Sequence, residues 1–133
     1  GIIKKFFTKE LTNPRLNKIY KETELDTRKY LCSIIDEIQK GNSLKISLES
    51  VFKNIEIGAG ANAFLFNSQI CNVITNHKVN FNGRHHTLFI NKNDYSILVS
   101  TTPLTEHAIE IPNYTLIQID LNALNVNMIK LEF

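Results

Sequence analysis

The sequence predicts an α+β fold, in which N-terminal helices pack on one face of a C-terminal antiparallel sheet of about five strands. Apolar residues recur at helical spacing within residues 1–57. From residue 63 onward, short runs of Ile, Val, Phe and Leu alternate with Asn, Gly, Asp and Pro. The connections between these runs are too short for the crossovers that parallel strands need, so we expect antiparallel pairing.

Length and composition fit a single domain over residues 1–133, mainly helical in 1–57 and mainly sheet in 63–133. Of these residues 43% are hydrophobic and 21% charged, as in ordinary globular proteins. No apolar run approaches the roughly 18 residues that span a bilayer, and the start of the chain is too charged for a secretory signal. We expect a soluble protein without a membrane partner, acting in the cytoplasm or exported as part of a larger protein. Because its one methionine is Met128, we also expect the chain to be processed, tagged or cut from a longer one.

The first helix is expected over residues 14–22. Asn13 is a favourable N-cap, and Pro14 suits the first helical position because an N–H there has no helical partner. Three apolar residues at helical spacing then form one stripe.

A second helix, over about residues 24–40, has the stronger signal. Thr23 followed by Asp26 is a variant of the capping box, and Lys40 with Gly41 is typical of a helix C-terminus. Four apolar residues at helical spacing are expected to be buried against the sheet: Leu31, Ile34, Ile35 and Ile38.

Residues 43–57 carry a mixed signal. Leu44, Ile46 and Leu48 alternate as in a strand, whereas the apolar residues after Ser47 suit a helix. We favour a short helix around residues 47–54, after which the glycines at 58 and 60 break the chain.

Seven strands are expected in the second half of the chain. Residues 80–83 carry a hairpin signal, and residues 91–94 resemble a four-residue hairpin loop. The predicted strands are residues 63–66, 69–74, 78–81, 87–91, 95–100, 115–121 and 127–133.

The two cysteines, Cys32 and Cys71, both lie within apolar patterns, so we expect buried free thiols. A disulfide or a redox pair is the alternative. The chain has no CxxC motif and no close pairing of Cys with His, so we expect neither a structural zinc site nor another metal or cofactor.

Charge is unevenly distributed along the chain. Residues 1–30 hold eight Lys or Arg against four Asp or Glu, whereas residues 67–133 hold four against five. A basic segment on a nearly neutral body suits either an RNA backbone or an acidic protein partner. A solvated helix face with surplus lysine is the alternative.

The segment from Ile55 to Ala63 contains Gly58-Ala59-Gly60 after a strand-like run. It resembles the glycine-rich loop of Rossmann-like methyltransferases and the dinucleotide fingerprint, in which glycines let the backbone approach the ligand. The resemblance covers nine residues. The acidic residue expected about 20 positions later is replaced by His77-Lys78-Val79.

Ser100-Thr101-Thr102 follows a strand-like run and precedes Pro103. This segment resembles the Ser-Thr-Ser strand motif of ADP-ribosyltransferases, in which that strand supports the nicotinamide pocket and a later glutamate activates the ribose. The resemblance implies that role for Glu132, and the upstream Arg or His would come from residues 84–86.

His85-His86-Thr87 runs into Leu88-Phe89-Ile90. This run is similar to the His-x-Thr strand pattern of two-histidine phosphoesterases. Those enzymes carry the pattern twice, whereas the segment after His107 lacks the hydroxyl.

The main candidate site is a set of imidazoles and cations in the sparsely charged half of the chain. Its members are His77, Lys78, Arg84, His85, His86 and His107. If residues 78–81 and 87–91 form a hairpin, His77 approaches the His85/His86 pair, of which only one can face a given site. The alternative is exposed histidines beside a structural arginine.

Three function hypotheses follow from these residues. A metal-independent ribonuclease needs one imidazole as base, a second acid and a cation for the phosphorane, which suits this set. Such a domain could be the C-terminal toxin of a bacterial competition system. The second hypothesis is a non-enzymatic immunity or adaptor module that binds through a sheet face or through the basic helices, with an apolar patch supplied by residues 67–133. An ADP-ribosyltransferase-like domain is the third.

Overall fold

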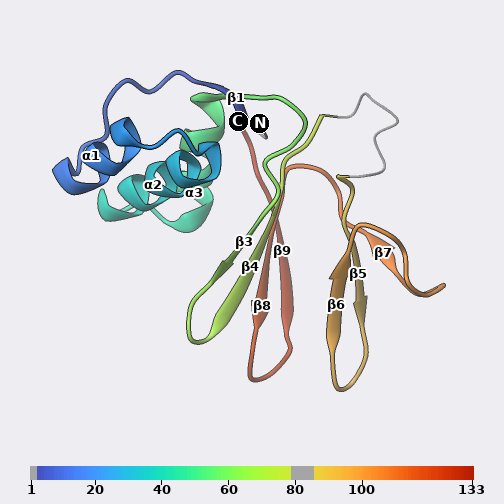
Figure 1. The fold of residues 1–133 in the computed structure, drawn as a ribbon. Coiled ribbons are helices and arrows are strands. Elements are labelled where there is room, and N and C mark those ends of the chain that lie inside the picture. Colours follow the sequence, from blue (N-terminus) through green and yellow to red (C-terminus); the bar gives the residue numbers. More distant parts are fainter. Residues whose placement is uncertain (1–2, 79–85) are drawn as a thin grey trace. The chain divides into compact units, whose positions relative to one another are not determined.

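A computed structural model describes residues 3–78 and 86–133 (Figure 1). Three helices come first in the chain and antiparallel strands follow, which confirms the α+β prediction. The strands form sheets of two, four and three strands instead of one sheet of about five. Two units pack separately, Gly1–Ala59 with Leu131–Phe133 (the helical unit) and Gly60–Lys130 (the strand unit). Whether the chain is a single domain stays a prediction.

The first helix, α1, spans Pro14–Glu22 as predicted. The side chain of Asn13 caps it by accepting hydrogen bonds from the backbone N–H groups of Arg15 and Leu16. Thr23 adopts an extended conformation, and its N–H donates to the carbonyl of Ile19 at 3.1 Å. Thr23 therefore ends α1, and the prediction that it begins the second helix was wrong.

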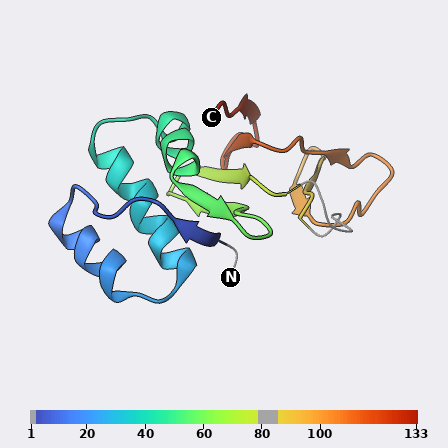
Figure 2. The ribbon, with the colours of Figure 1, turned by 90° about the horizontal axis from the view of Figure 1, so that it is seen from above.

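The second helix, α2, spans Asp26–Gln39, close to the predicted range. Lys40 is the C-cap residue of α2. Gly41, which follows it, has φ +93°, a left-handed conformation that a residue without Cβ adopts freely. Figure 2 shows α1 and α2 side by side, and α2 also packs on α3.

The buried face of α2 differs from the predicted one. Ile34 is buried with 1% exposed, and Ile35 is half-buried. Leu31 and Ile38, which we expected in the core, are 44% and 42% exposed. Tyr30 and Cys32 are buried in their place, so the buried stripe is rotated around the helix relative to the predicted one.

The third helix, α3, spans Leu44–Lys53 and begins three residues before the predicted start. Ser43 is its N-cap, and its hydroxyl oxygen accepts from the N–H of Ile46 at 3.3 Å. This cap favours a helix over the strand-like alternation that follows it. Two short strands of the helical unit, β1 (Ile3–Phe6) and β2 (Ile55–Ile57), pair antiparallel and were not predicted.

The strand unit contains two antiparallel sheets, ordered β3-β4-β8-β9 and β6-β5-β7. Six of its strands correspond to predicted ones within two residues at their starts. The strands are β3 (Ala63–Phe66), β4 (Ile70–Thr75), β5 (Phe89–Lys92), β6 (Ile97–Ser100), β7 (Ile109–Glu110), β8 (Thr115–Asp120) and β9 (Val126–Lys130). The predicted strand 78–81 and its hairpin lie largely outside the described residues, and β7 was not predicted.

One apolar core joins the two sheets of the strand unit. The four-stranded sheet contributes Val73 and Ile117, both with 0% exposed, and the other sheet contributes Ile90. Leu88 and Ile111, which flank β5 and β7, are also buried in this core, and the N–H of Ile111 donates to the carbonyl of Leu88. This pairing fixes the chain just after His86.

The described part of the chain contains no helix that is both long and apolar enough to cross a membrane.

Candidate functional site

Two of the predicted site residues, His77 and His86, meet at Gly60 in the strand unit. Gly60 and His77 form an antiparallel bridge just beyond the ends of β3 and β4. A Cβ added to Gly60 would lie 3.2 Å from Cβ of His77 and 3.4 Å from Nδ1 of His86. The two side chains therefore approach the same point of the backbone, and a Cβ at residue 60 would be in tight contact with His77.

The backbone around this junction is fixed by short hydrogen bonds. The N–H of Ala61 donates to the carbonyl of Asn76 at 2.6 Å, which continues the pairing of β3 with β4. His77 directly follows Asn76, and His86 is three residues before β5. Each histidine is thus attached to a sheet strand by a short segment.

The ring of His77 is buried without a hydrogen-bond partner. His77 is 8% exposed, and neither Nδ1 nor Nε2 is bonded within the described residues. Nδ2 of the neighbouring Asn76 is also buried and unpaired there. Leaving a polar group buried and unpaired costs on the order of 1–3 kcal/mol, so native proteins keep few of them, often where a water, a ligand or a reaction uses the group.

His86 is partly buried as a residue, whereas His77 is buried. Among the atoms of His86, Nδ1 lies closest to a Cβ added at Gly60. The two histidines therefore approach one place and differ in their burial. General acid and base catalysis at one phosphate needs two such proton-carrying groups.

The described part of the structure does not place any of the other four candidate residues beside Gly60. Lys78 is exposed and directly follows His77. Arg84 and His85 lie outside the described residues. His107 is exposed, with Nε2 3.5 Å from Oε1 of Glu106.

The strand register separates His107 from His86. Because Ile109 of β7 pairs with Ile90 of β5, His107 lies toward the Lys92 end of β5 and His86 lies before its other end. Six residues of extended chain between these ends span about 20 Å. The structure therefore unites His77 with His86 and leaves His107 apart from them.

No family model, curated protein or solved structure matches this chain. The site is therefore interpreted from its own geometry.

Two asparagines that the sequence analysis did not select hold the backbones of these histidines. Asn62 bonds to the carbonyl of His86, and Asn113 bonds to both backbone groups of His77. Asparagine is common throughout this chain, so no sequence signal separates these two residues from the others.

The strand-glycine-helix arrangement of a dinucleotide site is not formed at residues 55–63. The strand β2 does precede the glycines, but β3 follows them where the fingerprint requires a helix. Ser100 ends β6, and its hydroxyl donates to the carbonyl of Thr102 at 2.6 Å. Glu132, the acid that the ADP-ribosyltransferase resemblance needs, belongs to the helical unit.

Both cysteines are buried free thiols, as predicted. Burial raises the pKa of Cys32, although the positive charge of Arg28 opposes this, and burial also raises the pKa of Cys71. A raised pKa keeps the thiolate scarce near neutral pH, so neither cysteine is set up as a nucleophile. Within residues 3–78 and 86–133, no three His, Cys, Asp or Glu side chains are grouped to hold a metal ion.

A second feature of the strand unit is an apolar cleft of about 280 Å³. Phe64 and Phe66 of β3 lie on one side of it and Ile97 and Val99 of β6 on the other. The two phenylalanine rings are stacked with centroids 6.5 Å apart, and Phe66 is 67% exposed. Both β3 and β6 are edge strands of their sheets.

Proposed function

We propose that this chain is a small metal-independent ribonuclease whose acid and base are His77 and His86. The observation that supports it is the approach of both side chains to Gly60. Histidine suits this role because its ordinary pKa, near 6.5, keeps acid and base forms available at neutral pH. The ring nitrogens of His77, which have no hydrogen-bond partner within residues 3–78 and 86–133, are further support, because a substrate group would supply one.

In the proposed reaction one imidazole accepts the proton of the ribose 2′-OH, and the 2′-oxygen attacks the adjacent phosphorus. The bond from phosphorus to the 5′-oxygen breaks, and the other imidazole protonates that leaving oxygen. The products are a 2′,3′-cyclic phosphate and a free 5′-OH. Lys78, exposed next to His77, supplies positive charge for the phosphorane. Arg84 and His85 remain predicted participants.

The test is cleavage of a mixed RNA pool in chelator between pH 5 and 8. We expect a bell-shaped pH profile, because one imidazole must be protonated and the other neutral. His86→Ala should lower the rate roughly 10²- to 10⁴-fold, the usual effect of losing a general acid or base. His107→Ala is the matched control and should leave the rate unchanged, because His107 lies toward the other end of β5. Intact RNA with the wild-type protein, or an equal loss in both variants, would contradict the proposal.

The apolar cleft favours a second candidate, a non-enzymatic module that binds a protein partner. Two edge strands line the cleft, so an extended segment with apolar side chains on one face would suit it. A synthetic peptide of alternating Val and Thr should then shift the backbone resonances of β3 and β6. Phe66→Ser should abolish those shifts, whereas the control Tyr95→Ser, at an exposed aromatic outside the cleft, should preserve them. Resonances that do not move would remove this candidate.

A further inference from the structure

The side chain of Asn62 connects the two histidine segments. Its Nδ2 donates to the carbonyl of His86 at 2.6 Å, and its Oδ1 accepts from the N–H of Asn76 at 2.9 Å. Asn76 is covalently joined to His77. One amide group therefore links the backbone of His86 to the segment that carries His77, across positions that are distant in sequence.

The side chain of Asn113 binds His77 from another direction. Its Oδ1 accepts from the N–H of His77 at 3.0 Å, and its Nδ2 donates to the carbonyl of His77 at 2.6 Å. This paired donor and acceptor reproduces what a neighbouring strand would offer. Asparagine makes both bonds because its planar amide carries a carbonyl acceptor and N–H donors on separate atoms, whereas an ionised Asp carboxylate has no donor for the His77 carbonyl.

These four hydrogen bonds all go to backbone atoms and leave the imidazole nitrogens unused. The backbones of both histidines are thus held while their rings stay available for proton transfer. Misplacing a catalytic group by about 1 Å can lower a rate about 100-fold, so such supports matter to a reaction that needs two groups.

Resting on the ribonuclease function proposed above, we propose that Asn62 and Asn113 are positioning residues that hold His86 and His77 together at Gly60. Neither asparagine touches the substrate. Asn62 sets the spacing between the two histidine segments, and Asn113 fixes the strand position of His77.

The first measurement separates kcat from KM for RNA cleavage. Asn62→Ala and Asn113→Ala should each lower kcat about 100-fold, while KM stays within about twofold because the charges that bind phosphate are unchanged. The control is Asn127→Ala on β9, an exposed asparagine whose side chain makes no hydrogen bond within the described residues. It should match the wild type. Equal kcat in all three variants would overturn the proposal.

The second measurement does not depend on activity. In NMR spectra of the wild-type protein we expect cross-peaks that connect both histidine side chains to the Hα protons of Gly60. Asn62→Ala should remove the His86 cross-peak and keep the one from His77. If the wild type cleaves no RNA but these changes occur, the ribonuclease function fails and the positioning role stands. If the cross-peaks persist in the variant, the positioning role is wrong even when RNA is cleaved.

A third variant guards against simple misfolding. Asn62→Asp keeps an oxygen to accept the Asn76 N–H but sets a carboxylate oxygen, which has no proton to donate, against the His86 carbonyl. A cooperative thermal transition would show that this variant folds, and it should lose the His86 cross-peak. A folded Asn62→Asp protein with that cross-peak intact would overturn the role of this hydrogen bond.

Discussion

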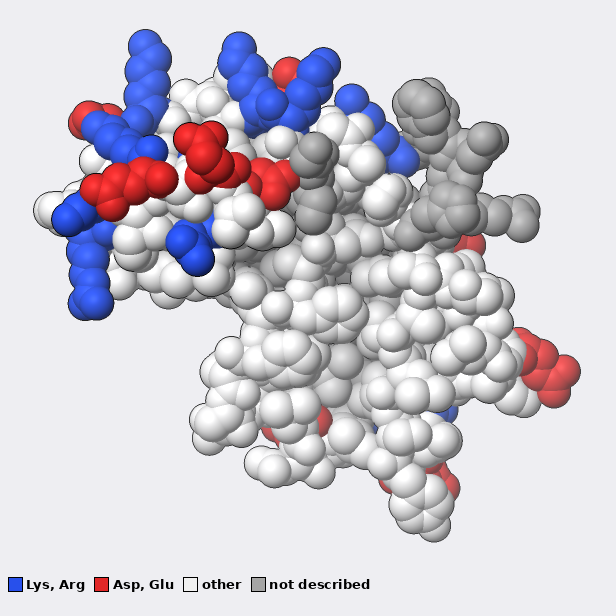
Figure 3. Space-filling model, in the orientation of Figure 1, with Lys and Arg blue, Asp and Glu red and all other residues white. Residues whose placement is uncertain are grey.

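The two units differ most in how much charge they carry. The 62 residues of the helical unit include eleven Lys or Arg and nine Asp or Glu, whereas the 71 residues of the strand unit include four of each kind. Figure 3 shows this on one face, where Lys and Arg gather over the helical unit. The net charge is 11 − 9 = +2 for the helical unit and 4 − 4 = 0 for the strand unit, so long-range attraction of a phosphate backbone would come from the helical unit.

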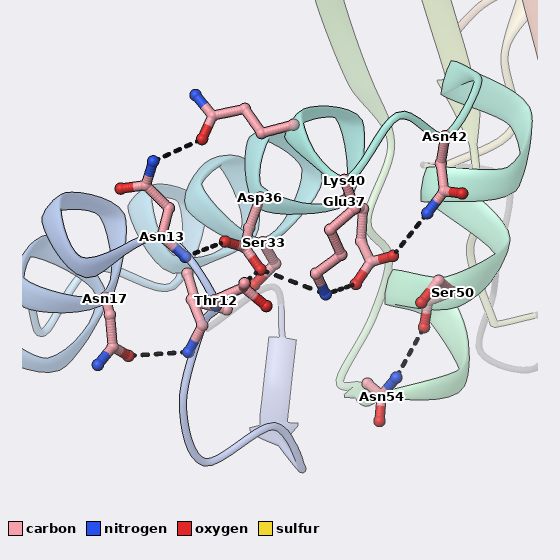
Figure 4. Close-up of polar contacts among 12 residues, drawn as sticks. Thr12, Asn13, Asn17, Ser33, Asp36, Glu37, Lys40, Asn42, Ser50 and Asn54 are labelled. Carbon is pink, nitrogen blue, oxygen red and sulfur yellow. Dashed lines mark hydrogen bonds and ion pairs between the residues drawn. The ribbon is translucent and has the colours of Figure 1, made fainter.

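The same difference appears in their buried polar groups. In the helical unit Asp36, 2% exposed, accepts from the N–H groups of Thr12 and Asn13 and lies 3.4 Å from Nζ of Lys40 (Figure 4). Burial alone would raise the pKa of Asp36, but these hydrogen bonds and the ammonium group together hold it below its usual value. The helical unit therefore contains a buried carboxylate, Asp36, that becomes protonated in acid.

The strand unit uses neutral groups in the equivalent role. Thr75 is completely buried, and its Oγ1 donates to the carbonyl of Pro112 and accepts from the N–H of Thr115, both at 2.9 Å. Hydroxyl and amide side chains do not titrate between pH 3 and 8. Acid should consequently weaken the helical unit at Asp36 and leave the hydrogen bonds of Thr75 unchanged.

The largest expected effect tests whether the helical unit has the core described for it. Ile34→Ala should lower the free energy of unfolding by about 2–5 kcal/mol, because Ile34 is 1% exposed and its loss leaves a cavity. Leu31→Ala, three positions earlier on α2, should change it by less than about 0.5 kcal/mol, since Leu31 is 44% exposed. Urea titration of both variants measures this. Equal losses of unfolding free energy in the two variants would show that Leu31 is buried, as the sequence predicted.

The next effect compares the hydrogen bonds of the charged Asp36 side chain with those of the neutral Thr75 side chain. Asp36→Asn should cost about 1.5–3 kcal/mol at pH 7, the range for a hydrogen bond to a charged group. Because the pKa of Asp36 is lowered in the folded state, its contribution is complete above the ordinary value near 3.8 and is lost as the pH falls through the folded value. The difference between wild type and Asp36→Asn should therefore shrink below about pH 4.

Thr75→Val is the matched comparison in the strand unit. It leaves a buried carbonyl and a buried N–H unpaired, which costs about 1–3 kcal/mol. That cost should be the same at pH 7 and pH 3, because a hydroxyl does not titrate there. Urea titrations at both pH values compare the two substitutions. A pH-independent cost for Asp36→Asn would show that its charge does not stabilise the helical unit.

The sequence predicted most elements because their signals are local. The cap at Asn13, the glycine at 41 and the apolar alternation of β3 act within a few residues. The pairing of β1 with β2 joins residues about 50 positions apart, so no local sequence pattern predicts it. The rotation of the buried stripe of α2 likewise depends on packing within the helical unit.

The sequence predicted the residue types of the site and, if residues 78–81 and 87–91 form a hairpin, the approach of His77 to the His85/His86 pair. His77 and His86 were selected because imidazoles carry protons, but their meeting point depends on Gly60, which comes from a different part of the chain. The glycine instead suggested a nucleotide loop. Asn62 and Asn113 each act through two hydrogen bonds to residues distant in sequence, which leave no periodic pattern in the sequence.

The smallest expected effect concerns the basic segment before α1. Lys4 already pairs with Glu56 at 3.2 Å, and Nζ of Lys5 lies 5.1 Å from the centroid of the Phe7 ring, whereas Lys9 has no ion-pair partner within the described residues. Exposed pairs of this kind are worth only about 0–1 kcal/mol, so a phosphate backbone can displace them.

If this segment binds RNA, replacing all three lysines with glutamine should flatten the dependence of log affinity on log salt by about 2, since each phosphate contact with a single strand contributes about 0.7. Lys9→Gln alone should flatten the slope by about 0.7, one phosphate contact, because the Lys9 ammonium has no ion-pair partner within the described residues. Lys92→Gln, at an exposed lysine of the strand unit, is the control and should leave the slope unchanged. Binding measured by fluorescence anisotropy between 50 and 200 mM salt gives the slopes. An unchanged slope in the triple variant would show that these lysines only face solvent and do not contact RNA. A flattened slope in Lys92→Gln would show that RNA binds to the strand unit.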